Sequence, residues 1–293
     1  MSLNSINTNI GAQVALASLN STNTQLQASQ KRISTGLRVA DATDDGGAYA
    51  IAQRVRSDVG ALTSSNEQLG NAKGLVSTAV TALGKISDSI NTAKTLLVKI
   101  GDNSIAQDQR DQYVASYKSL VSQVADYVDG STYNGQTLLG KTGGATGAGR
   151  TVVSSEDGNT LSISAADNSG LANTLAGLIG TTFSRSGGAD TFTGTAAQTT
   201  AATALSGTAF SAALKGVADQ LNQTGADSNR LDATIAFNSS KIDSLNAGMG
   251  ALIDTDLSKE SAKLQALQIK QQLGTQALSL ANQAPQSLLS LFK

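Results

Sequence analysis

An apolar residue recurs at every seventh position along residues 51–100, and no proline interrupts the repeat. The only proline of the chain is Pro285, so nothing earlier forbids a very long helix. The positions three residues after each member of this repeat are mostly small, and seven such heptads are typical of helices packed side by side. As one helix this segment would be about 75 Å long. The repeat consists of Val55, Leu62, Leu69, Val76, Leu83, Ile90 and Leu97.

Two other segments are predicted to pack beside this helix. Residues 107–129 place Tyr117, Val124 and other large side chains on one helical face. A third long seam runs over residues 214–252, and aromatic residues make up only 3% of the chain, so aliphatic packing between helices must supply the core. The sequence therefore predicts a mainly α fold, an antiparallel helical rod. The third seam contributes Ile235, Ile242 and Leu245.

Both ends of the chain lack charge, because residues 1–30 and 271–292 contain no Asp, Glu, Lys or Arg. The helices of an ordinary soluble bundle, which is the alternative, carry charges on their outer face. Burial of about ten aliphatic side chains per end gives roughly 15–30 kcal/mol, against roughly 1–2 kcal/mol per residue for ordering the backbone. We therefore expect the two ends to fold only against each other and against neighbouring copies. The predicted buried positions are Ile6, Ile10, Leu16, Leu19, Leu26, Ile33, Leu264, Leu267, Leu273, Leu278, Leu280, Leu288 and Leu291.

Composition removes several classes of function. The 21 basic and 22 acidic residues leave a net charge of -1, which offers no electrostatic attraction to nucleic acid or an anionic membrane. Cys and His are both absent, which excludes thiolate chemistry, soft metal sites and the usual near-neutral acid or base. No apolar run is long enough to span a bilayer, and the first residues lack the basic start of a secretory signal peptide. We expect no membrane insertion. Composition alone leaves a carboxylate or lysine enzyme possible, and it is together with the motifs described below that we expect no catalytic site, metal or cofactor.

The chain changes character between residues 141 and 204, where Gly, Thr, Ser and Ala dominate. Apolar pairs around Asp157-Gly158 predict a β-hairpin, and residues 171–179 predict a short helix. The rest of this stretch is interpreted as a surface insert. Three parts are therefore predicted. They are a terminal coiled-coil core (1–45 with 254–293), a helical rod (46–140 with 205–253) and an outward-facing segment (141–204).

One segment, residues 135–142, matches the phosphate-binding pattern GxxxxGK[ST] in full. That loop cradles phosphates only between a buried strand and a following helix. Here a predicted helix end precedes the segment, and Gly143-Gly144 follows it. Two glycines lose much conformational entropy in a helix, so a helix is not expected to begin there. Nucleotide binding is therefore kept only as a minor alternative. The acidic pairs Asp44/Asp45 and Asp254/Asp256 precede helices and are interpreted as caps rather than cation ligands.

Several motifs, in order along the chain, resemble those of bacterial flagellins. Residues 34–45 resemble the SSGLR…A.DD motif, and residues 50–54 resemble AIANR. Residues 133–139 resemble FNG…LL, while the tail resembles QQAGT…ANQ.PQ..L.LL. The resemblance covers about 1–140 and 205–293. The matching positions include Gly36, Leu37, Arg38, Asp44, Asp45, Arg54, Asn134 and Gly135.

The resemblance implies an architecture and a life history. The termini would pair as a coiled coil lining a central channel, with the longer helices forming a shell around it. The chain would be a secreted, extracellular, non-enzymatic subunit of the flagellar filament, exported unfolded by the flagellar type III apparatus. Its partners would be further copies of itself, an export chaperone at the C-terminal segment, the filament cap and the hook-associated proteins.

Three other functions remain open at this point. A hook–filament junction protein shares both terminal patterns but forms only a thin adaptor layer, so abundance in sheared flagella distinguishes it. A P-loop enzyme predicts nucleotide turnover. A self-contained helical adhesin predicts a monomer that is protease-resistant throughout.

Overall fold

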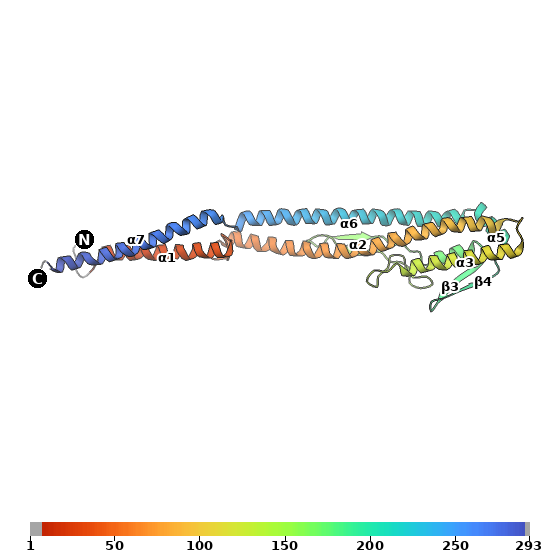
Figure 1. Ribbon diagram of the computed structural model, residues 1–293, viewed down its shortest axis with the longest axis horizontal. Coiled ribbons are helices and arrows are strands. Elements are labelled where there is room, and N and C mark those ends of the chain that lie inside the picture. Colours follow the sequence, from red (N-terminus) through yellow and green to blue (C-terminus); the bar gives the residue numbers. More distant parts are fainter. Residues whose placement is uncertain (1–7, 291–293) are drawn as a thin grey trace. The chain divides into compact units, whose positions relative to one another are not determined.

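The computed structural model describes residues 8–290, with the side chains of 284–290 left undescribed. Within this range the chain forms seven helices and two antiparallel strand pairs (Figure 1), which confirms the predicted mainly α class. The elements are α1 (Ile10–Thr35), α2 (Gly46–Gly101), α3 (Gln107–Gly130), β1 (Arg150–Val153), β2 (Thr160–Ile163), α4 (Leu171–Gly177), β3 (Thr182–Ser186), β4 (Ala189–Thr193), α5 (Gln198–Ser206), α6 (Ala209–Ile253) and α7 (Leu257–Ser290).

The chain divides into two compact units. One unit holds the chain up to Val59 and from Asp243 onward, and the other holds Gly60–Ile242. Both α2 and α6 contribute residues to each unit. The three-part division drawn from the sequence stays a prediction.

Helix α2 begins where Asp45 caps it and continues because its apolar seam is unbroken. The Asp45 carboxylate accepts hydrogen bonds from the amides of Gly47 at 3.1 Å and Ala48 at 3.0 Å. In the unit Gly60–Ile242, the seam residues from Leu62 to Leu97 are fully buried. Ile235 and Ile242 of the same unit are partly buried, as are Val55 and Leu245, which belong to the unit that holds both chain ends.

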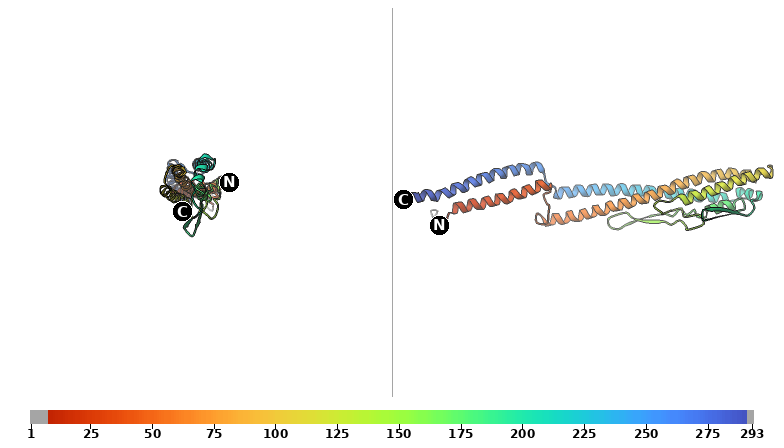
Figure 2. Two further views of the ribbon diagram at one scale, coloured as in Figure 1. Left: turned by 90° about the vertical axis from the view of Figure 1, so that its right-hand side faces the viewer. Right: turned by 60° about the horizontal axis from the view of Figure 1, so that its bottom comes forward.

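Within the Gly60–Ile242 unit, α6 runs antiparallel to α2. Asn238 donates to the side chain of Asn66 at 3.0 Å, and Lys73 pairs with Asp232 at 2.5 Å. Helix α3 contributes to the same apolar cluster, and its buried Tyr117 hydroxyl donates to the carbonyl of Leu175 in α4 at 2.8 Å. Figure 2 shows α2, α3 and α6 lengthwise beside one another in this unit.

The central segment is more ordered than the sequence predicted. The hairpin β1–β2, with Val152 opposite Leu161, and the short helix α4 match the prediction. The β3–β4 hairpin and α5 were missed, because Thr, Ser and Gly leave too few apolar residues to show a period. Phe183 packs edge-on against Phe192 at 5.2 Å between ring centres and is buried in the same cluster as α2 and α3. The segment therefore adds to the core rather than lying on it as a plain insert.

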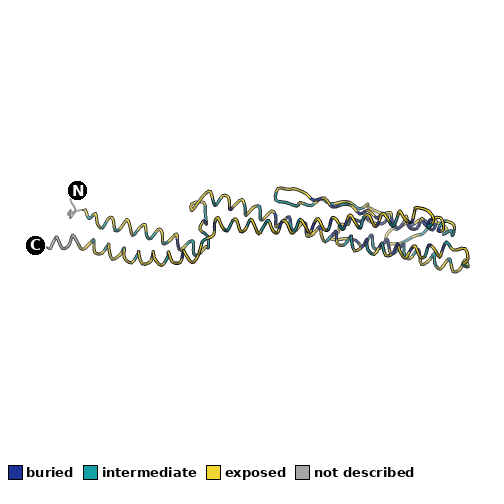
Figure 3. Tube along the Cα trace, turned by 90° about the horizontal axis from the view of Figure 1, so that it is seen from above, coloured by how far each residue is buried: buried dark blue, intermediate teal, exposed yellow. Residues whose placement is uncertain are grey.

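Burial differs between the two units. In Figure 3, the helices of Gly60–Ile242 carry many dark-blue buried positions, whereas α1 and α7 are drawn mainly in yellow and teal. The terminal helices therefore leave most of their surface uncovered by the chain itself.

Candidate functional site

The terminal helices α1 and α7 form an antiparallel pair (Figure 1). Asn9 donates to the carbonyl of Ala281 at 2.7 Å, and Gln271 donates to Asn23 at 2.8 Å. Partner numbers fall along α7 as they rise along α1, which fixes the antiparallel direction. The Asn9 side chain also accepts from the amide of Ala12 at 3.0 Å and so caps α1.

An apolar seam joins α1 to α7. Leu267 is buried, at 4% exposure, and a Cβ added at Gly274 would lie 3.2 Å from Leu19, so the two helices approach closely there. Burial of these side chains is driven by removal of apolar surface from water. The other predicted core residues that are partly buried here are Leu26, Ile33, Leu264 and Leu278.

A polar pair that was not predicted from the sequence interrupts the seam. Ser29 is 1% exposed and Glu260 is 7% exposed. The Ser29 hydroxyl donates to the Glu260 carboxylate at 2.6 Å, and Lys263 lies 3.6 Å from the same carboxylate. A signal was present, because Ser29 lies at a seam position between Leu26 and Ile33 where an apolar residue is expected.

Large apolar side chains of both helices are also exposed, which a single chain does not explain. Ile10 and Leu16 of α1 are 42% and 46% exposed, and Leu273 and Leu280 of α7 are 58% and 71% exposed. These four were predicted to be buried in an assembly of several copies, and a single chain leaves that prediction untested. Ile6 and Leu291 lie outside the described residues, and the side chain of Leu288 is not described. Also exposed in this unit are Val14, Ile51, Leu252, Leu257 and Ile269.

Gly36, Leu37 and Arg38 join the end of α1 to the chain between α6 and α7. Gly36 has φ +72°, which an L side chain rarely adopts, and its amide donates to the Arg32 carbonyl at 2.9 Å. The Arg38 amide donates to the carbonyl of Ile253 at 2.6 Å, and the Thr255 amide donates to the Gly36 carbonyl at 2.9 Å.

The same junction is held by side chains. The Arg38 guanidinium donates to the carbonyl of Leu252. At the same junction, Val39, Ala52 and Ile253 form a small buried cluster of their own. The glycine and the arginine of this motif therefore have a structural role in placing α1 beside α7.

Acidic residues near the junction serve turns and caps. Lys31 bonds Asp41 at 2.6 Å and Asp44 at 3.1 Å, and the hydrogen bond from Lys31 holds the pKa of both carboxyls below its usual value. Asp256 caps α7 by accepting from the amides of Ser258 and Lys259 at 3.0 and 3.1 Å. Arg54 is exposed. Among the described residues, no group of His, Cys, Asp or Glu is placed to hold a metal ion.

The segment Gly135–Thr142 lacks the geometry of a phosphate loop. Asn134 and Gly135 form a tight turn with φ +49° and +72°. Helix α3 precedes the loop and strand β1 follows it, whereas a phosphate site requires a strand before the loop and a helix after it. The amide of Thr142 already donates to the Asp129 carboxylate at 2.7 Å. A carboxylate at that amide repels a phosphate.

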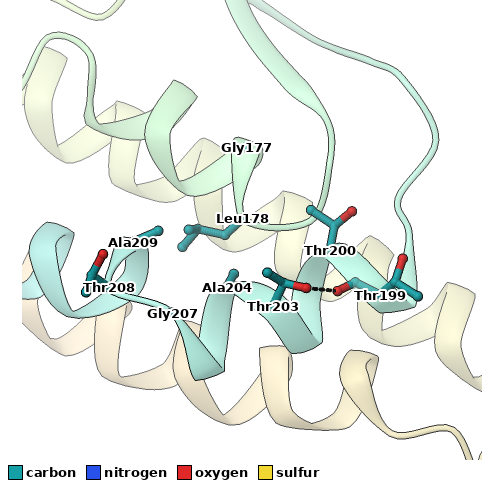
Figure 4. Close-up of a pocket in the computed structure, with 9 residues that line it drawn as sticks. All are labelled: Gly177, Leu178, Thr199, Thr200, Thr203, Ala204, Gly207, Thr208 and Ala209. Carbon is teal, nitrogen blue, oxygen red and sulfur yellow. Dashed lines mark hydrogen bonds between the residues drawn. The ribbon is translucent and has the colours of Figure 1, made fainter.

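A shallow cavity of about 460 Å³ lies between α4, α5 and the start of α6 (Figure 4). Its residues are Thr199, Thr200, Thr203 and Thr208 together with small or apolar side chains, and Thr203 donates to the Thr199 carbonyl at 2.8 Å. None of its lining residues is ionisable. It therefore supplies no acid, base or nucleophile of the activated kind that catalysis requires.

Comparisons with known proteins agree with this arrangement. Residues 6–143 match the bacterial flagellin N-terminal helical region, and residues 208–292 match the C-terminal helical region. Flagellin FljM of Caulobacter vibrioides is 36% identical over 295 residues, covering 100% of both chains. A flagellin of Brucella melitensis is also 36% identical, covering 99% of both chains.

Among solved structures, the crystal structure of Bacillus cereus flagellin covers 58% of this chain and 88% of its own, with 21% identity and a TM-score of 0.47. No helix within residues 8–290 combines the length and apolar character needed to cross a membrane. The two family models and the full-length relatives show that this chain belongs to the bacterial flagellin family, a family of non-enzymatic structural proteins of the flagellar filament.

Proposed function

We propose that the chain polymerises into the bacterial flagellar filament and serves motility as an extracellular structural subunit. The observation that carries the proposal is the exposed apolar face of α1 and α7, in the two segments that match the family models. Isolated apolar residues on a surface are ordinary, but a face of large ones marks an interaction site.

Burial of these side chains favours assembly. Seven large apolar side chains of α1 and α7 are 42–71% exposed. Full burial of such a side chain contributes about 1.5–3 kcal/mol, so burial of the exposed part of all seven contributes roughly 6–12 kcal/mol gross. Part of this is offset by ordering of side chains and chain ends. Contacts that join different surfaces of successive copies, and do not close, produce an open helical polymer. The seven residues are Ile10, Val14, Leu16, Leu257, Ile269, Leu273 and Leu280.

Export and assembly partners follow from the same proposal. The chain would leave the cell unfolded through the flagellar type III apparatus, and weak coverage of α1 and α7 in the single chain suits threading. An export chaperone would cover the C-terminal segment, and the cap and hook-associated proteins would contact the polymer at its ends. In this proposal the terminal residues form the inner core, the longer helices form the rod, and residues 141–204 lie furthest out.

Replacement of Leu273 by Lys tests the assembly surface. Leu273 is exposed in the single chain, so Leu273→Lys leaves the monomer's circular dichroism unchanged and prevents filament growth from wild-type seeds. Gln272→Lys is the matched control, because Gln272 is an exposed neighbour with a polar side chain. Normal filaments from Leu273→Lys would contradict the proposal.

The role within the flagellum is tested separately by abundance. A filament subunit dominates the protein released by shearing flagella, whereas a junction protein is a minor band. Deletion of the gene removes most of that protein if the chain is a main filament subunit.

A further inference from the structure

A groove of about 390 Å³ lies in the Gly60–Ile242 unit, between α2, the turn at residues 133–136 and the β1–β2 hairpin. Leu75, Val152 and Ile163 line its apolar part. Amide side chains on its rim come from Gln68 and Asn71, and Arg150 supplies its one charged group. The groove thus combines an apolar surface with a cation and amide donors.

Arg150 has no counter-ion within the described residues. It is the first residue of β1, its side chain is partly buried, and its Nε atom is buried without a hydrogen-bond partner. By contrast, Arg185 bonds three carboxylates and Arg230 lies near Asp227. A buried donor is normally satisfied, so Arg150 has hydrogen-bonding capacity that the described residues do not use.

The rim of the groove is held in place. Asn134 adopts φ +49° and Gly135 φ +72°, and the amides of Tyr133 and Gln136 each donate to the other's carbonyl at 2.9 Å. The ring of Tyr133 rests against Gly74, where an added Cβ would lie 2.6 Å from the ring. A preformed rim lowers the entropy lost when a ligand binds.

We propose that this groove binds an Asp or Glu carboxylate of a second copy of the chain. A guanidinium presents a planar fork that matches a carboxylate, and the amides add donors beside it. The chain offers such groups, because several acidic residues are exposed and have neither an ion pair nor a side-chain hydrogen bond within the described residues. They are Glu67, Asp88, Asp108, Asp157, Asp243 and Asp254. This inference rests on the proposed function, because every copy meets others at a fixed spacing only in a polymer.

Removal of the charge provides the first test. Arg150→Gln raises the critical concentration for polymerisation by about 10- to 100-fold, the range expected for loss of a charged hydrogen bond. Lys141→Gln is the matched control, because Lys141 is exposed and lies outside the groove, and it polymerises like wild type. Monomer thermal unfolding of Arg150→Gln stays within a few degrees of wild type. An unchanged critical concentration for Arg150→Gln overturns the inference, whereas wild-type protein that never polymerises contradicts the proposed function instead.

A charge exchange identifies the partner. Arg150→Glu blocks assembly, and a double variant that adds a Lys substitution at the partner carboxylate restores it. The candidates are Glu67→Lys, Asp88→Lys, Asp108→Lys, Asp157→Lys, Asp243→Lys and Asp254→Lys. Restoration by one of these, with the same Lys substitution unable to improve assembly of the wild-type background, supports the proposal. Failure of all of them overturns it. In that case, an Arg150 Nε–Hε NMR signal of the monomer that shifts with sodium acetate, but not with sodium chloride, assigns the groove to a free carboxylate.

Discussion

Removal of the Ser29 hydroxyl should weaken the α1–α7 pair far more than its size suggests. The hydroxyl is the closest partner of the Glu260 carboxylate, at 2.6 Å, and both residues are buried. In Ser29→Ala the carboxylate keeps only Lys263, at 3.6 Å. A buried acceptor left unsatisfied costs about 1–3 kcal/mol, and more when it is charged.

The assay is the critical concentration for filament growth from seeds. A loss of about 1–3 kcal/mol per subunit raises it by about 5- to 150-fold. Ser18→Ala is the matched control, because Ser18 is exposed on the same helix, and it changes the value by less than about twofold. The double variant Ser29→Ala/Glu260→Leu recovers most of the loss, because replacement of both partners by apolar groups leaves no unpaired charge.

The pair also sets register. Antiparallel apolar seams with a seven-residue repeat tolerate slips by one heptad, and a buried polar pair penalises them. The chain contains no cysteine, so Asn23→Cys with Gln271→Cys, at positions whose native side chains are hydrogen-bonded, reports the native register through a short thiol-specific cross-linker. Ser29→Ala lowers the yield of this cross-link. An unchanged yield together with a wild-type critical concentration would refute the reasoning.

Three further predictions concern other parts of the chain. The hydrogen bond from Arg185 lowers the pKa of Asp190, so its contribution to stability is complete above the unfolded pKa of about 3.9 and is lost as pH falls through the folded value. The protection of the β4 amides, relative to their intrinsic exchange rates, should therefore fall below about pH 4, and Arg185→Gln should abolish that dependence. Gly147→Ala should lower the unfolding temperature by several degrees, because its Cβ would lie 2.1 Å from the Leu138 carbonyl oxygen; melting followed by circular dichroism checks it. Limited proteolysis of the monomer should remove residues from roughly 1–40 and 255–293 and spare 50–250, and protease-resistant termini would count against assembly-driven folding.

The helical part of the fold was predictable because burial in α2 repeats with a period that the sequence carries. Positions from Leu62 to Leu97 are buried every seven residues, and nothing breaks the helix between them. The β3–β4 hairpin had no comparable signal, since its strands consist mainly of Thr, Ser, Asp and Arg. Its turn, Gly187-Gly188, has φ +59° and +85°, and that glycine pair was the one local indication of a hairpin. Arg185 then holds the hairpin to α3 through Asp129 at 3.0 Å, a tertiary contact that no local pattern contains.

At the terminal helices the sequence predicted which residues avoid water but not which molecule covers them. Leu267 and Leu273 carry the same side chain on the same helix, yet one is 4% and the other 58% exposed. Along α7, residues 264, 267, 271, 274 and 278 face α1, while apolar residues 262, 266, 269, 273, 277 and 280 follow a second line at the same spacing. One partner helix covers one such line, so a helix with two lines requires a second partner. The absence of charge from residues 271–292 fits this requirement, because an outer face meant for water would carry charges. The width of the apolar surface, more than any single motif, therefore indicates that the folded state of α7 belongs to an assembly.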